Sequence, residues 1–143
     1  KELGLQAIYQ NHSGSNYVGA PLWDLHELFK AHDPKHLAVG FDMSHATAEG
    51  TRAWPLHANL LRPRIGALYV KSFRWKDNKR DNCSLAEGIV DKKYPGQLIK
   101  SGYSGPINLH VEYLKPFNKE NVPNQIVAIK KDILTLKEWL NWS

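Results

Sequence analysis

Cysteine is almost absent from this 143-residue sequence, because Cys83 is the only one. A single cysteine can form neither an internal disulfide nor a thiolate metal cluster. Hydrophobic residues make up 42% of the chain and aromatic residues 10%, which is enough to bury a core. We therefore expect residues 1–143 to form a single domain.

Long apolar runs are also missing. No stretch approaches the roughly 18 apolar residues of a membrane span, and the opening KELGLQAIYQ lacks the apolar core of a signal peptide. The sequence starts at Lys1 without an initiator methionine, so we expect it to continue upstream. A cytoplasmic location without membrane contact is the prediction, with a secretion signal before Lys1 as the alternative.

Acidic residues are fewer than basic ones, 14 against 19, which gives a formal net charge of +5. The lysines are scattered along the chain instead of being gathered on one face of an element. This distribution is typical of a solvated basic surface, whereas nucleic-acid binding requires a continuous patch. The sequence therefore predicts no nucleic-acid partner.

Hairpin signals such as Asn-Gly between apolar runs are absent, and strand-like and helix-like segments alternate instead. Four such units in succession predict an α/β fold with parallel strands and right-handed crossovers. Residues 74–84 read as a polar loop. The predicted strands are 3–10, 36–41, 64–73 and 106–114, and the predicted helices are 21–32, 51–63, 94–101 and 122–140.

Polar side chains lie at or near the carboxyl ends of all four predicted strands. Ligands of parallel α/β folds collect beyond the carboxyl ends of the strands, so these residues are the candidates for a site. Residues two apart on a strand also share a face. The candidates are Gln10, Asn11 and His12; Asp42 with His45; Tyr69 and Lys71; and His110 with Glu112.

Each candidate also has a structural interpretation. Asp42 is a suitable N-cap for the segment that follows it, and His12 in NHSGS suits a loop histidine bonded to nearby backbone. Lys71 could end a strand by reaching into solvent. Glu112 is different, because a carboxylate inside the apolar run LHVEYL requires a partner.

The order of five segments resembles the carboxyl-terminal half of the sugar phosphate isomerase/epimerase family, the xylose isomerase-like TIM barrels. The most specific are Asp42-x-x-His45 and the closing combination of Gly102, Tyr103, Gly105 and Glu112. The resemblance covers nearly the whole chain and implies the last four βα units of a (β/α)8 barrel. The segments are NHSG, FD-x-x-H, YVK, AEG and GYSGPINLHVEY.

The resemblance implies a divalent metal, Mn, Mg, Co or Zn, with Asp42 and Glu112 among its ligands and His45 on the substrate. Such a site stabilises an enediolate while a carboxylate moves a proton. Three positions depart from the family pattern. Gln10 stands in place of a glutamate, Tyr69 in place of a histidine and Ser72 in place of an aspartate.

Nearby residues could compensate for these departures. His12 or His110 could be recruited as ligands. Lys71 brings a positive charge that repels a cation yet could itself stabilise an enediolate or bind a phosphate.

The first hypothesis is a sugar or sugar-phosphate isomerase or epimerase. Glu112 and Lys71 would be its catalytic residues, and the substrate would be bound by His45, His12, Asn11 and His110. The alternative is a carbohydrate-binding relative without catalysis, in which Trp54 and Trp75 stack on the sugar. A phosphodiesterase of the apurinic endonuclease type ranks last, because its metal cluster needs more ligands than these strand ends supply.

The site hypothesis requires that Asp42 and Glu112 face one cavity. Four parallel strands also leave two open edges and an uncovered apolar interior. We therefore expect this chain to be a fragment of a longer chain, with its amino-terminal half missing, or to form a homo-oligomer.

Overall fold

The computed structural model describes residues 3–142. These residues divide into two compact units. The first runs up to Tyr69 and includes Tyr103–Asn108, and the second comprises Val70–Gly102 and the chain from Leu109 onward. That the whole chain forms one domain stays a prediction.

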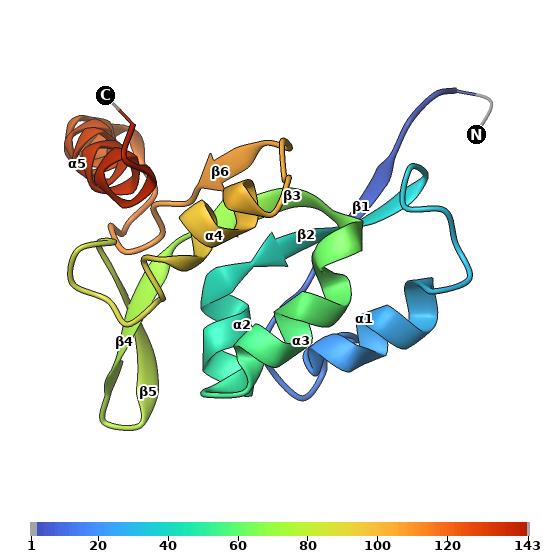
Figure 1. The fold of residues 1–143 in the computed structure, drawn as a ribbon. Coiled ribbons are helices and arrows are strands. Elements are labelled where there is room, and N and C mark those ends of the chain that lie inside the picture. Colours follow the sequence, from blue (N-terminus) through green and yellow to red (C-terminus); the bar gives the residue numbers. More distant parts are fainter. Residues whose placement is uncertain (1–2, 143) are drawn as a thin grey trace. The chain divides into compact units, whose positions relative to one another are not determined.

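A four-stranded parallel sheet forms the centre of the first unit, and the last residues of two strands belong to the second (Figure 1). The strands lie in the sheet in the order in which they occur in the sequence. The predicted α/β class with parallel strands is therefore confirmed. In sheet order the strands are β1 (Ala7–Gln10), β2 (Leu37–Asp42), β3 (Ile65–Val70) and β6 (Ile107–Leu109).

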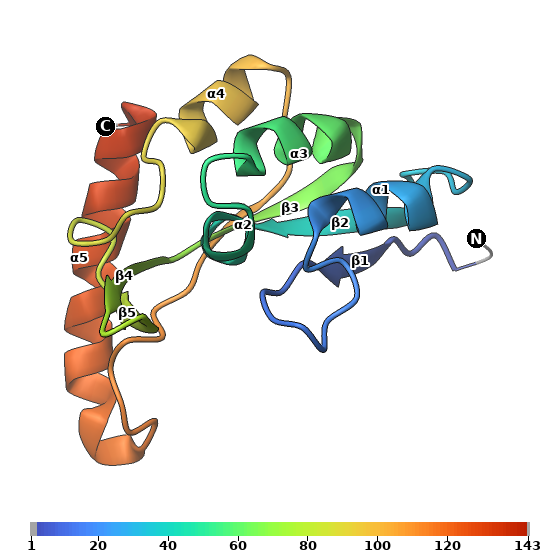
Figure 2. The ribbon, with the colours of Figure 1, turned by 90° about the horizontal axis from the view of Figure 1, so that it is seen from below.

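Helices of the first unit cover one face of this sheet, as Figure 2 shows. The helix α1 packs against α3, and the core beneath them contains Leu25, Phe41, Leu61 and Leu68, all fully buried. The prediction of one helix over 51–63 missed a helix that starts directly after β2. The elements are α1 (Leu22–Phe29), α2 (Met43–Gly50), α3 (Trp54–Leu61) and the 3-10 turn η1 (Arg62–Arg64).

The second unit begins with an antiparallel hairpin. The strand predicted over 64–73 was therefore too long, since β3 ends at Val70, and the polar loop predicted over 74–84 was wrong. Strand β4 (Ser72–Lys76) pairs with β5 (Lys79–Cys83). Asp77 and Asn78 connect them with φ of 50° and 57°. Asp and Asn tolerate this left-handed region and supply the tight turn that two-residue hairpin loops need.

The fourth predicted strand, 106–114, was too long. The strand β6 ends at Leu109, so His110 and Glu112 lie in the segment after it. The last predicted helix is confirmed at its bounds, since α5 spans Val122–Leu140. The second unit also contains α4 (Tyr94–Lys100) and the 3-10 turn η2 (Lys119–Asn121).

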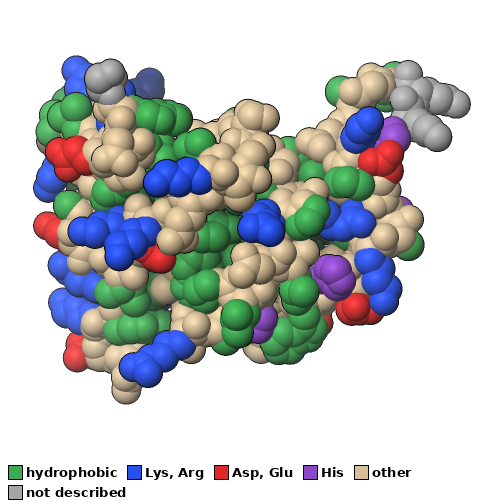
Figure 3. Space-filling model, viewed as in Figure 1, with side chains coloured by type: hydrophobic (Ala, Val, Ile, Leu, Met, Phe, Trp, Pro, Cys, Tyr) green, Lys and Arg blue, Asp and Glu red, His purple; other side chains and the backbone are tan. Residues whose placement is uncertain are grey.

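The surface agrees with the scattered charge of the sequence. On the face drawn in Figure 3, lysine and arginine side chains are dispersed among hydrophobic ones. Within residues 3–142, no helix has both the length and the apolar composition needed to cross a bilayer.

Candidate functional site

Asp42 lies at the carboxyl end of β2 and is fully buried. Its Oδ1 accepts hydrogen bonds from the backbone N–H of Ser44 (3.0 Å) and of His45 (3.1 Å). These are the bonds of an N-cap on α2, and they explain why a helix begins here. The structural interpretation of Asp42 is confirmed.

The end of β1 is tied to Asp42 by two amide side chains. Gln10 donates from Nε2 to Oδ2 of Asp42 at 2.8 Å. Asn11 accepts from the backbone N–H of Asp42 at 2.7 Å and donates to its carbonyl at 3.1 Å. Asn11 thus extends the pairing of β1 and β2 by one side chain.

His45 stands one helical turn beyond Asp42, with Nε2 at 3.8 Å from Oδ2 of Asp42. The backbone N–H of Ser13 donates to His45 Nδ1 at 3.2 Å, which leaves the proton of the neutral ring on Nε2. The ring of His12 lies against His45 and Tyr17, with centroid distances of 3.7 and 4.0 Å. His12 Nδ1 is 2.9 Å from the Ser13 carbonyl, as its loop interpretation predicts.

A second cluster lies in the other unit, where the chain leaves β3 and β6. The Lys71 ammonium donates to both carboxylate oxygens of Glu112, at 3.0 and 3.1 Å. Only 6% of the Lys71 side chain is exposed, against 39% for Glu112. The alternative that Lys71 reaches into solvent is therefore wrong. Lys71 is the partner that the Glu112 carboxylate was predicted to require. His110 Nδ1 lies 3.4 Å from Oε1 of Glu112.

The segment that contains Glu112 is bonded to α5 through the next residue, Tyr113, in a hydrogen-bond network that the sequence analysis missed. Tyr113 donates its hydroxyl to Asp132 Oδ2 on α5 at 3.1 Å, and the Leu85 N–H donates to Oδ1 at 3.2 Å. Asp132 is 1% exposed, and burial raises its pKa above the usual range. Burial also raises the pKa of Tyr113, and the negative charge of Asp132 adds to that rise. A signal was available, because Asp132 stands four residues from the buried Ala128 and from Leu136.

Two of the substituted family positions have packing roles. A Cβ at Gly40 would lie 2.5 Å from Cε2 of Tyr69, so the Tyr69 ring covers the glycine of the adjacent strand. The hydroxyl of Ser72 fills the space at Gly88, where a Cβ would lie 1.8 Å from Oγ. Tyrosine and serine at these positions are thus matched to neighbouring glycines.

The two predicted stacking tryptophans differ in exposure. Trp54 is the first residue of α3 and is 5% exposed, with its ring 6.2 Å from that of Phe41. Trp75 lies on β4, is 52% exposed and meets Phe73 edge-on. Trp75 is therefore the one of the pair with an open ring face.

Within neither unit does the donor set fit the divalent metal that the resemblance implies. Among residues 3–142, no group of three or more His, Cys, Asp or Glu side chains is placed to hold a metal ion. The oxygens of Asp42 accept N–H donors from the first unit, and those of Glu112 accept the Lys71 ammonium. Asp42 and Glu112 belong to different units. That they face one cavity and bind a metal stays a prediction.

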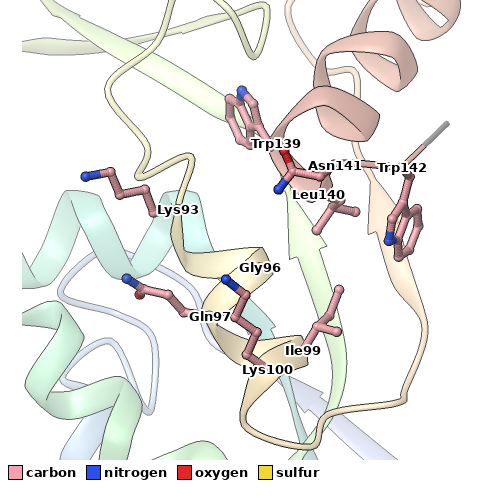
Figure 4. Close-up of a pocket in the computed structure, with 9 residues that line it drawn as sticks. All are labelled: Lys93, Gly96, Gln97, Ile99, Lys100, Trp139, Leu140, Asn141 and Trp142. Carbon is pink, nitrogen blue, oxygen red and sulfur yellow. The ribbon is translucent and has the colours of Figure 1, made fainter.

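A cavity of about 330 Å³ lies between α4 and the end of α5 in the second unit, as Figure 4 shows. Trp139 and Trp142 line it from α5 and the residues after it, and Lys93 and Lys100 line it from the side of α4. None of the predicted site residues is among its lining residues.

Strands in sequential parallel order, joined by helices and ending in polar side chains, are what half of a (β/α)8 barrel contains. The model of the family described as xylose isomerase-like TIM barrel matches residues 1–139, and the chain belongs to that family. The family resemblance that the sequence motifs predicted is therefore confirmed.

One solved structure with the same fold is titled "Crystal structure of D-tagatose 3-epimerase-like protein". The two are 20% identical in sequence with a TM-score of 0.64, and the match covers 96% of this chain and 50% of that chain. This chain thus spans about half the length of that structure. The comparison of this chain with curated proteins found no match.

Proposed function

We propose that this protein is a sugar or sugar-phosphate isomerase or epimerase that moves a proton at the carbon next to a carbonyl. The observation that carries the proposal is the pair of Glu112 and the nearly buried Lys71, in contact at 3.0 and 3.1 Å. Membership of the xylose isomerase-like family supports it.

In the proposed reaction Glu112 accepts the proton from the carbon next to the carbonyl. The C–H electron pair forms the enediolate double bond, and negative charge develops on the former carbonyl oxygen. Lys71 stabilises that oxygen, since charge-assisted hydrogen bonds gain strength as the oxygen becomes negative. Return of the proton from Glu112 to the former carbonyl carbon, with transfer of the α-hydroxyl proton to the former carbonyl oxygen, completes an isomerisation. An epimerisation instead needs a second acid, which delivers a proton to the opposite face of the same carbon.

The surroundings of Glu112 suit a carboxylate that has to reach a substrate. It is 39% exposed, whereas its neighbour Tyr113 is anchored to buried Asp132. Because the backbone beside Glu112 is fixed and its side chain is partly exposed, the carboxylate can contact the substrate carbon next to the carbonyl while the segment after β6 stays ordered. His110 Nδ1 lies 3.4 Å from the same carboxylate.

Deuterium exchange tests the proposal. The protein is incubated in D2O with a panel of ketoses, aldoses and their phosphates, and proton NMR follows the signal next to the carbonyl. D-Tagatose enters the panel first because of the name of the similar structure. We expect loss of that signal with at least one sugar, and no loss with the variant Glu112→Gln.

The alternative function is carbohydrate binding without catalysis. The neutral amide of Gln10 beside Asp42 and the exposed ring of Trp75 favour it. Binding of a sugar that quenches tryptophan fluorescence, with no exchange for any member of the panel, would replace the first proposal with this one. The variant Trp75→Phe should then weaken binding.

A further inference from the structure

The positive charge at Glu112 comes from a side chain of the protein itself. We propose that the Lys71 ammonium takes the place of the divalent cation that the family resemblance implies. The enediolate is then stabilised by Lys71, and turnover does not depend on a divalent metal. This inference rests on the proposed function and names the electrophile of that same site.

The first argument is the geometry at Glu112. A metal bound to a carboxylate lies about 2.0–2.6 Å from its oxygens. Both oxygens of Glu112 already accept hydrogen bonds from the Lys71 nitrogen, at 3.0 and 3.1 Å. A dication on the same oxygens would therefore lie within a few ångströms of an ammonium. Because only 6% of the Lys71 side chain is exposed, water screens that repulsion poorly.

The second argument comes independently from the first unit. Asp42 Oδ1 accepts two backbone N–H groups of α2, and Oδ2 accepts the Gln10 amide at 2.8 Å. A glutamate at position 10 would place a second carboxylate beside Asp42, an arrangement that needs either a cation between the two or a shared proton. Glutamine removes the second carboxylate and satisfies Asp42 with a neutral donor.

Each of the two predicted metal carboxylates is thus compensated within its own unit by N–H donors. The group that stabilises the enediolate would then be an ammonium in place of a dication. An ammonium carries one positive charge, which matches the single negative charge of an enediolate made from an α-hydroxy aldehyde or ketone. Lys71 keeps its proton throughout and donates a hydrogen bond to the developing oxyanion, while Glu112 carries the transferred proton.

Metal binding tests the inference without any substrate. Electron paramagnetic resonance of Mn²⁺ is recorded with the full chain, the variant Gln10→Glu, which places a second carboxylate beside Asp42 within the first unit, and the matched control Lys76→Met, which removes an exposed lysine from β4. We expect free Mn²⁺ with the wild type and the control, and bound Mn²⁺ with Gln10→Glu. Stoichiometric Mn²⁺ on the wild type, or none on a Gln10→Glu variant with unchanged circular dichroism, would overturn the inference.

Chemical rescue separates an electrophile from a structural lysine. In Lys71→Ala, deuterium exchange into the sugar should fall at least 100-fold and recover in part when ethylammonium is added. The wild-type rate should be unchanged by EDTA. Exchange that stops with EDTA and returns with Mn²⁺ would overturn the inference and leave the proposed function standing. Absence of exchange with every sugar, under all these conditions, would instead count against the function.

Discussion

The ammonium nitrogen of Lys71 contacts both carboxylate oxygens of Glu112, although 41 residues separate the two in sequence. They meet because Lys71 follows β3 and Glu112 lies just beyond β6, and these strands are adjacent in the sheet. Parallel neighbours end at the same edge, so residues that follow them are brought together. The pair is a product of strand order.

Removing the acid–base group at Glu112 should abolish most turnover. In Glu112→Gln the amide cannot accept a proton, so we expect kcat to fall by about 100-fold or more with little change in KM. The neutral amide has nearly the size of the carboxylate and still accepts one hydrogen bond from Lys71. The matched control is Glu120→Gln, on the exposed turn η2, which should retain full activity. Equal losses in both variants would contradict the role of Glu112.

Asp42 should contribute to stability through its N-cap. Asp42→Ala removes the acceptor of two backbone N–H groups and of the Gln10 amide, so we expect a loss of about 1–3 kcal/mol in the free energy of unfolding. Asp42→Asn keeps an oxygen for the cap and should lose much less. Urea unfolding of the two variants measures the difference. A loss as large in Asp42→Asn as in Asp42→Ala would show that the charge, not the cap, stabilises the fold.

The buried Asp132 should make stability depend on pH. Burial raises its pKa in the folded state, so the native protein holds this proton at pH values where the unfolded chain has released it. Stability should therefore fall as pH rises from the unfolded pKa, about 4, through the raised folded pKa. Asp132→Asn should flatten this part of the curve.

Urea midpoints measured at several pH values test this dependence. The control is Asp77→Asn, at the exposed turn of the hairpin, where asparagine suits the positive φ. Its curve should follow the wild type. A decrease in stability that persists in Asp132→Asn would assign the dependence to another group.

The glycine at position 88 should tolerate no side chain. A Cβ there would lie 1.8 Å from Ser72 Oγ and 2.9 Å from the Phe73 carbonyl oxygen, so Gly88→Ala should cost about 1–3 kcal/mol. Gly96 is the matched control, because its Cβ would meet nothing closer than 3.7 Å and alanine favours the helix α4. Gly96→Ala should be neutral or up to about 1 kcal/mol stabilising, as thermal or urea unfolding would show.

Much of the sheet could be predicted because apolar runs bounded by turns identify strands locally. The ends of β1 and β2 were predicted to carry polar site residues, and Gln10 and Asp42 do lie there in contact. The hairpin of β4 and β5 was missed because charged residues fill its strands and an Asp-Asn turn joins them. The end of β6 was placed too far along, since the apolar residues of LHVEYL do not distinguish a strand from a packed segment.

The amino-acid sequence by itself determined the α/β class and the family, because these follow from local periodicity and from motifs along the chain. Only the tertiary structure decided that Lys71 is buried against Glu112, that Gln10 binds Asp42 and that Asp132 anchors Tyr113. These pairs join residues distant in sequence. Their contacts depend on which strands and helices become neighbours, and no local pattern contains that information.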